Sequence, residues 1–88
     1  NGAYLDSLGW AYFKLDRFDS AEPHLRKASL QMEWNSVIQD HLGDLMFELG
    51  RIEEAITAWE AALAGDREDV DALMIEQKIQ EAQPQLGR

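Results

Sequence analysis

The sequence DSLGWAYFKL at residues 6–15 returns 34 positions later as DHLGDLMFEL at residues 40–49. The same offset aligns 32 consecutive pairs without a gap, starting with Ala3 and Val37, and 8 of these pairs are identical. Pairs that differ keep their character, as Leu25 and Trp59 do. A repeat length of roughly 20–50 residues is typical of stacked architectures. We therefore predict two copies of one structural unit.

Each unit is predicted to contain two helices. Apolar residues follow the spacing of a helix face at Leu5, Leu8, Tyr12 and Leu15, then at Ala21, Leu25 and Ala28, and late in the second unit at Ala55, Trp59, Ala62 and Leu63.

A fifth helix is expected from about Asp69 to about Gln83, where Pro84 prevents its continuation. Its inward face is expected to carry Val70, Leu73 and Ile79. The remaining positions are mostly polar, which suits the helix that closes a stack.

Local signals place the helix ends. Asp19 and Ser36, each followed three residues later by Glu or Gln, fit boxes that cap the start of a helix. Gly50 and Gly65 are expected to end helices in the left-handed conformation that glycine adopts at low cost. Pro23, inside the second helix, is expected to cause a small distortion without breaking it.

Small residues recur where neighbouring helices would touch. Gly9 and Gly43 occupy the same repeat position, although glycine within a helix costs about 0.5–1 kcal/mol relative to alanine. A packing reason is therefore expected. With Ala21 and Ala55, these glycines would let two helix backbones approach closely while larger neighbours fill the space around them.

The composition fits one small globular domain. Of 88 residues, 45% are hydrophobic and 28% are charged, and the absence of cysteine excludes disulfides and thiolate metal sites. The longest uncharged stretch is seven residues, at 7–13. A membrane-spanning helix needs about 20 apolar residues, so no membrane insertion is expected.

The charge is acidic and uneven. The net charge of −9 divides into −1 for residues 1–34, −6 for residues 35–68 and −2 for residues 69–88. Nucleic acid and anionic membrane surfaces are therefore poor partners, and basic partners are favoured.

No catalytic or cofactor-binding arrangement is evident. Asp40, His41 and Asp44 come nearest to a metal site, but positions 40 and 41 point about 100° apart on a helix, so a structural or solvated role is favoured for His41. The six glycines are scattered and form no phosphate-binding loop. We predict no enzymatic activity, no metal and no cofactor.

These spacings resemble the tetratricopeptide repeat family. The first unit reads Leu5-x2-Leu8-Gly9-x2-Tyr12 and Ala21-x3-Leu25-x2-Ala28, and the second reads Gln39-x2-Leu42-Gly43-x2-Met46 and Ala55-x3-Trp59-x2-Ala62. Leu5 and Gln39 depart from the aromatic residue of the family at that position. Gln39 is the odder of the two, because the position is usually buried and the sequence does not explain an amide there.

The resemblance implies an all-α fold, a right-handed superhelix of antiparallel helix pairs (an α–α solenoid) with five helices. It divides a single domain at 1–88 into repeat 1 at 2–35, repeat 2 at 36–69 and a capping helix at 70–83.

Because two repeats make a short array and the chain starts at Asn1, we expect a fragment of a longer array. Residues 5–10 also resemble the C-terminal repeats of long bacterial repeat proteins. No targeting segment is visible, and the compartment stays open.

In this family the first helix of each repeat lines a groove that holds segments of other proteins, and members are rarely enzymes. Carried onto this chain, the main groove positions are Asp6, Trp10, Phe13, Asp40, Asp44, Phe47 and Lys78. The same row also includes Ala3, Lys14, Val37, Glu48 and Met74. The resemblance therefore implies a groove that combines carboxylates with aromatic rings.

This groove is expected to hold a basic or mixed basic–apolar peptide or helix. An Arg or Lys of the partner could pair with Asp40 and Asp44 and lie on Trp10 or Phe13, a cation–π contact of about 0.5–2 kcal/mol. Changing both Asp40 and Asp44 to Lys should then weaken binding. The Lys and Asn residues by which one subgroup clamps a carboxylate are missing. A plain solvated acidic face is an equally weighted alternative.

A structural role competes with ligand binding. The first helix also carries Tyr4, Leu8 and Ala11, an apolar strip that another repeat would cover in a longer array. Self-association through this strip, which would make a homo-oligomer, is the alternative function. Trp34, near the repeat junction, is expected to be a packing residue.

Overall fold

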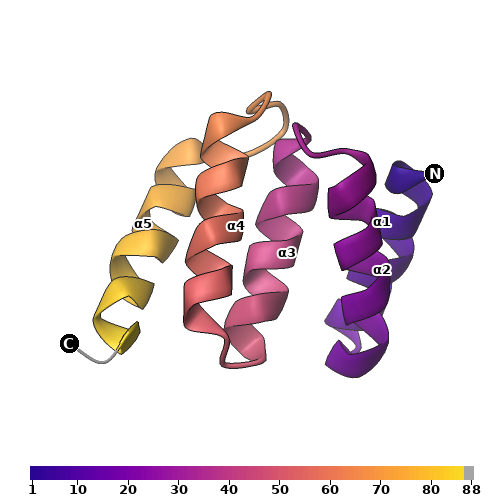
Figure 1. Cartoon of the computed structure of the whole chain (residues 1–88), viewed down its shortest axis with the longest axis horizontal. Helices are drawn as coiled ribbons and strands as arrows, with labels where there is room; N and C mark the ends of the chain where they lie inside the picture. The colour runs from indigo at the N-terminus through magenta and orange to yellow at the C-terminus, as the bar shows by residue number, and fades with distance from the viewer. Residues whose placement is uncertain (87–88) are drawn as a thin grey trace.

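The structure, a computed structural model, describes residues 1–86 and is all-helical there (Figure 1). The α-helices are α1 (Gly2–Lys14), α2 (Phe18–Gln31), α3 (Ser36–Glu48), α4 (Ile52–Ala64) and α5 (Ala72–Ala82), and the short 3-10 helix η1 (Gln83–Leu86) follows. The five α-helices confirm the predicted helical repeat solenoid. α2 continues unbroken through Pro23, as expected.

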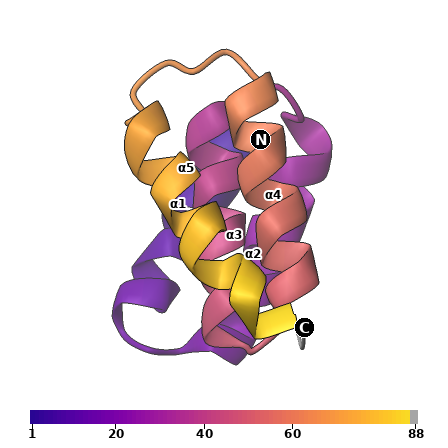
Figure 2. The ribbon, with the colours of Figure 1, turned by 90° about the vertical axis from the view of Figure 1, so that its left-hand side faces the viewer.

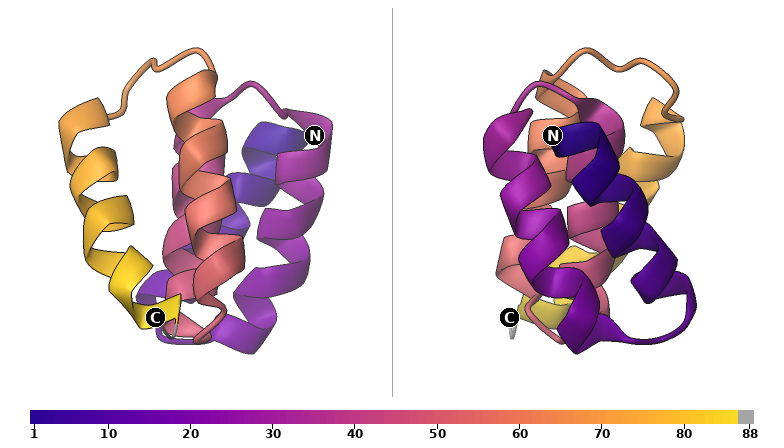
Figure 3. Two further views of the ribbon diagram at one scale, coloured as in Figure 1. Left: turned by 60° about the vertical axis from the view of Figure 1, so that its left-hand side comes forward. Right: turned by 90° about the vertical axis from the view of Figure 1, so that its right-hand side faces the viewer.

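The helices pack in chain order. α1 packs on α2 and α3 on α4, and the two hairpins meet where α2 contacts α3, with a smaller contact of α1 with α3. α5 packs on α4 after a long connection that loops over the end of the molecule opposite the C-terminus (Figure 2). The two views of Figure 3 show the α5 side and the α1–α2 side of this stack.

The two helical glycines have the packing role that their repetition predicted. A Cβ atom on Gly9 would lie 2.7 Å from Leu25 Cγ, and a Cβ atom on Gly43 would overlap the indole ring of Trp59. Ala21 and Ala55 are fully buried. Glycine therefore lets a large side chain of the second helix lie directly against the backbone of the first.

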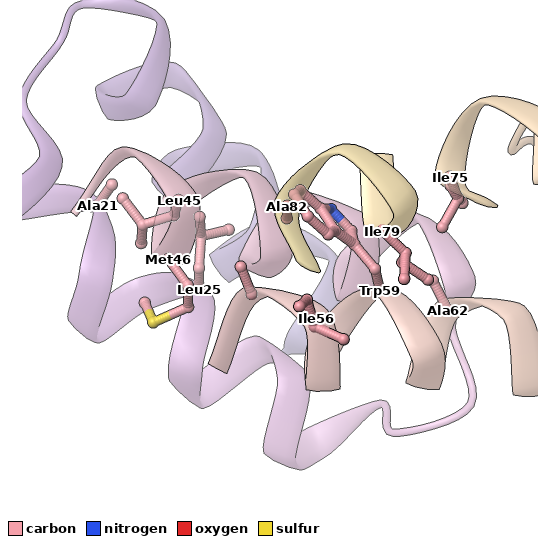
Figure 4. Packing of buried hydrophobic residues seen from close by; sticks show 11 residues of the cluster. Ala21, Leu25, Leu45, Met46, Ile56, Trp59, Ala62, Ile75, Ile79 and Ala82 are labelled. Carbon is pink, nitrogen blue, oxygen red and sulfur yellow. The ribbon is translucent and has the colours of Figure 1, made fainter. Parts of the chain in front are cut away.

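The core runs from α2 to α5 (Figure 4). On α5 its members are Ile75, Ile79 and Ala82, while Leu73 is 64% exposed. The prediction that Leu73 faces inward was therefore wrong. Positions two residues apart on a helix point about 200° away from each other. Because Ile75 is buried, Leu73 must therefore point away from the core.

Two predicted helix starts are shifted by one or two residues. The N-cap of α3 is Asn35, whose side chain accepts a hydrogen bond from the Ile38 N–H at 3.0 Å, so Ser36 is the first helical residue. Asp19 lies inside α2, whose N-cap position is occupied by Arg17 without a side-chain hydrogen bond. Neither predicted capping residue therefore caps its helix.

Only one of the two helix-ending glycines is left-handed. Gly50 has φ 78° at the end of α3, as predicted, but Gly65 has φ −84°. Position 65 has no room for a side chain, because a Cβ atom there would lie 2.6 Å from the Trp34 carbonyl oxygen. The left-handed residues after α4 are Arg67 and Asp69.

The unusual Gln39 bridges two helices. It is 5% exposed; its side-chain oxygen accepts a hydrogen bond from Ser29 Oγ at 3.1 Å, and its amide nitrogen donates to the Glu33 carbonyl at 3.1 Å. A buried amide whose oxygen and nitrogen both have hydrogen-bond partners costs little.

Trp34 was expected to be a packing residue, but it is 70% exposed, so that prediction was wrong. Its backbone carbonyl accepts a hydrogen bond from the Asp66 N–H at 2.9 Å.

Candidate functional site

A small pocket opens where α1, α3, α4 and α5 meet. Its volume is about 210 Å³, and we call it the Lys78 pocket; its lining residues are Phe13, Asp44, Phe47, Glu48, Trp59, Lys78 and Glu81. Typical small-molecule sites enclose roughly 300–1,000 Å³. The Lys78 pocket is smaller, so it suits a single long side chain better than a whole small molecule.

Lys78 reaches from α5 to two carboxylates of α3. Its Nζ atom donates hydrogen bonds to Asp40 Oδ1 at 3.0 Å and to Asp44 Oδ1 at 2.9 Å. Asp40 and Asp44 are four residues apart and therefore lie on one face of α3. The same Nζ atom lies 5.8 Å from the centre of the Trp59 ring, within the range of a cation–π contact.

Burial and neighbouring charges shift the pKa values of Lys78 and Asp44. Burial lowers the pKa of Lys78, but the hydrogen bonds to Asp44 and Asp40 outweigh it, and its pKa is raised overall. Burial raises the pKa of Asp44 and, with the neighbouring charge of Asp40, exceeds the opposing effect of Lys78. Lys78 is thus held in its charged form by two carboxylates, whereas burial is the main reason that the pKa of Asp44 is raised.

Aromatic rings form the apolar part of the pocket. Trp59 is 3% exposed, its ring lies 5.9 Å from that of Phe47, and its Nε1–H donates to Asp44 Oδ1 at 3.2 Å. On α1, Phe13 stacks on Trp10 with ring centroids 4.5 Å apart. An alkyl chain that carries a cation would thus find rings beside carboxylates.

The other predicted groove residues form a neighbouring cluster at the α1–α3 interface. The His41 ring stacks on Trp10 at 3.8 Å, and its Nδ1 atom lies 2.9 Å from Asp6 Oδ1. Asp6 is 8% exposed. Asp6 is therefore not a free surface carboxylate, and the His41 side chain packs against Trp10 and Asp6. No group of His, Asp or Glu side chains suited to a metal ion occurs within residues 1–86.

The predicted groove residues therefore separate into two groups. The Lys78 pocket and its ion pair contain Phe13, Asp40, Asp44, Phe47 and Lys78, and the neighbouring cluster contains Asp6 and Trp10. Trp59 and Glu81 also line the pocket and were not predicted as groove residues. Helical spacing assigned Trp59 to the core, which is correct, but it carried no signal that one edge of a core indole reaches the pocket.

The predicted self-association strip lies on a different face of α1. Tyr4 is 65% exposed, Ala11 is exposed and Leu8 is partly buried. Among the helices of residues 1–86, none has the length and apolar character required to cross a bilayer.

Comparisons with known proteins agree on one family. Residues 2–29 match the family model described as Tetratricopeptide repeat. Cell division cycle protein 27 homolog B of Arabidopsis thaliana is 36% identical over 62 residues, which are 70% of this chain and 8% of that protein. A solved structure of an arginine-to-glutamate mutant of MamA matches with a TM-score of 0.84 and 27% identity over 100% of this chain and 62% of that one. The repeat offset, the helix hairpins and these matches together show that the chain belongs to the tetratricopeptide repeat family.

Proposed function

We propose that this chain is a non-catalytic interaction module whose α1–α3–α5 face binds a segment of another protein through a basic side chain with apolar neighbours. Tetratricopeptide repeat proteins generally mediate protein–protein interaction and are typically non-catalytic scaffolds. The finer proposal, that the ligand is basic and that this face receives it, rests on the Lys78 pocket.

The observation that carries this proposal is the position of the Lys78 ammonium group. It lies between two carboxylates and near the Trp59 ring, which is the environment that a partner's Lys or Arg would need. Glu48 and Glu81 add two more acids to the lining, so acidic residues outnumber the single cation of the pocket. A basic segment is therefore attracted, and an acidic one is repelled.

Neutralising the two α3 carboxylates should weaken binding of a basic peptide. The change is Asp40→Asn with Asp44→Asn, because Lys at both positions would place three ammonium groups together around Lys78. Hydrogen bonds to charged groups contribute about 1.5–3 kcal/mol, so the affinity for an acetylated peptide with a central Arg beside Leu residues should fall by at least about 10-fold. Fluorescence titration at two salt concentrations measures the loss and a flatter salt dependence.

The matched control is Glu53→Gln with Glu60→Gln, which removes two charges from exposed positions of α4 outside the pocket. This control should retain most of the affinity, and the same peptide with citrulline in place of Arg should bind poorly to the unaltered protein. Equal affinity in both double variants would contradict the proposed site.

A second candidate function is self-association through α1, which the exposure of Tyr4 favours. Sedimentation velocity at rising concentration should then show a dimer or larger species, and Tyr4→Glu with Ala11→Glu should abolish it by placing charge in an apolar contact. A strictly monomeric protein at high micromolar concentration would argue against this function.

A further inference from the structure

We infer that Lys78 is an internal occupant of the site for the partner's basic side chain, so a partner must displace its ammonium group in order to bind. This inference rests on the proposed function and adds how the affinity of the site is set. It predicts that removing Lys78 tightens the binding of a basic ligand, although the removal deletes a contact within the folded protein.

Lys78 already makes the contacts that a basic ligand would make. Its Nζ atom has both α3 carboxylates within 3.0 Å and the Trp59 ring at 5.8 Å. The same Asp44 oxygen that accepts from Lys78 also accepts from the Trp59 Nε1–H. An incoming ammonium or guanidinium group would therefore find these acceptors occupied by Lys78.

The displacement can occur without unfolding α5. Ile75, Ile79 and Ala82 hold the helix on α4 as buried members of the core. The Lys78 side chain remains 26% exposed, so it has a path to solvent. Its long chain has several rotatable bonds and can turn outward while the backbone stays in place. The exchange is then one cation for another at a fixed pair of carboxylates.

A purely structural contact that fastens α5 to α3 predicts the opposite result. In that case removing Lys78 would loosen α5 and could not improve binding. The two interpretations are distinguished by the direction of the affinity change and not by the stability of the variant, which both expect to fall.

The first experiment compares Lys78→Met with Lys27→Met. Both variants lose one positive charge, and Lys27 is exposed on α2 outside the pocket, so the control corrects for the general attraction of a more acidic protein. For the acetylated Arg–Leu peptide we expect Lys78→Met to bind about 10-fold more tightly than Lys27→Met, since a charge-assisted hydrogen bond no longer has to be broken. Adding Asp40→Asn and Asp44→Asn should remove this gain.

The second experiment uses the unaltered protein, so it does not depend on the folding of a variant. The chain contains three lysines, Lys14, Lys27 and Lys78. Acylation followed by mass spectrometry should show slow modification of Lys78 and fast modification of the two exposed lysines. Saturation with the Arg–Leu peptide should raise the rate at Lys78 and leave the other two rates unchanged.

The outcomes test the displacement of Lys78 and the proposed function separately. Tighter binding in Lys78→Met together with faster acylation of Lys78 in the complex supports displacement. Binding of the peptide by the unaltered protein with neither effect overturns displacement and leaves the proposed function standing. Failure of both the unaltered protein and Lys78→Met to bind overturns both, because a vacated pocket would then have no affinity for a cation.

Discussion

Alanine at position 43 is expected to lower the free energy of unfolding by about 2–3 kcal/mol, as overpacking in a core does. The added Cβ would overlap the indole of Trp59, which is 3% exposed. That ring also donates to Asp44 at 3.2 Å and lies against Phe47, so it cannot move without breaking other contacts. The gain in helix propensity, about 0.5–1 kcal/mol, is too small to compensate.

Urea unfolding and thermal melts measure this effect. In a domain of this size each kcal/mol shifts the midpoint by about 4–8 °C, so Gly43→Ala should melt roughly 10–20 °C lower. Gly9→Ala is the matched variant, because its Cβ would meet Leu25 and His24 instead. We expect a smaller loss there, since an aliphatic side chain can shift more readily than a fixed ring.

A compensating change tests the cause of the Gly43 effect. Trp59→Leu gives repeat 2 the residue that Leu25 provides in repeat 1. If the clash is with the indole, Gly43→Ala with Trp59→Leu should lose clearly less stability than the sum of the two single changes. Strict additivity, or unaltered stability of Gly43→Ala, would contradict the close-packing explanation.

Alanine at position 36 is expected to lower the free energy of unfolding by about 2 kcal/mol. Ser36 is fully buried; its hydroxyl donates to the Ala62 carbonyl at 2.6 Å and accepts from the Arg67 N–H at 2.8 Å. Removing the hydroxyl takes the acceptor from the Arg67 N–H and leaves the Ala62 carbonyl with the longer hydrogen bond from the Gly65 N–H at 3.3 Å. Chemical denaturation measures the loss, and Ser7→Ala, at an exposed position of α1, is the control that should cost almost nothing.

The Ser36 effect should also extend to α5. Ser36 fastens the start of α3 to the connection that leads from α4 to α5, where Asp66 also accepts from the Ser36 N–H at 3.2 Å. The hydrogen bonds that the Asp66 carboxylate accepts from the Glu68 N–H and the Ser36 N–H lower the pKa of Asp66. Amide exchange in Ser36→Ala should therefore rise more in α5 than in α1. Equal protection of both helices would show that the connection does not position α5.

Two errors of prediction, at Ser36 and Gly65, share one physical cause, which is competition from residues distant in the chain. Ser36 matches a cap locally, yet its hydroxyl bonds residues 26 and 31 positions away, and Asn35 caps α3 instead. Gly65 matches a left-handed helix end locally, yet its constraint is the Trp34 carbonyl. Capping and turn signals describe a residue and its neighbours, so they cannot anticipate a partner in another helix.

Local periodicity determined the helices of this protein, because side chains three and four residues apart share a helix face whatever the rest of the chain does. The 34-residue offset likewise determined that the glycine-based packing occurs twice, and the four-residue spacing of Asp40 and Asp44 determined that they share a face. Which cation lies between them was decided only by tertiary structure, since Lys78 is 38 and 34 positions away and reaches them through the docking of α5 on α4. The pairing of Asp6 with His41, 35 positions apart, was decided in the same way by the contact of α1 with α3.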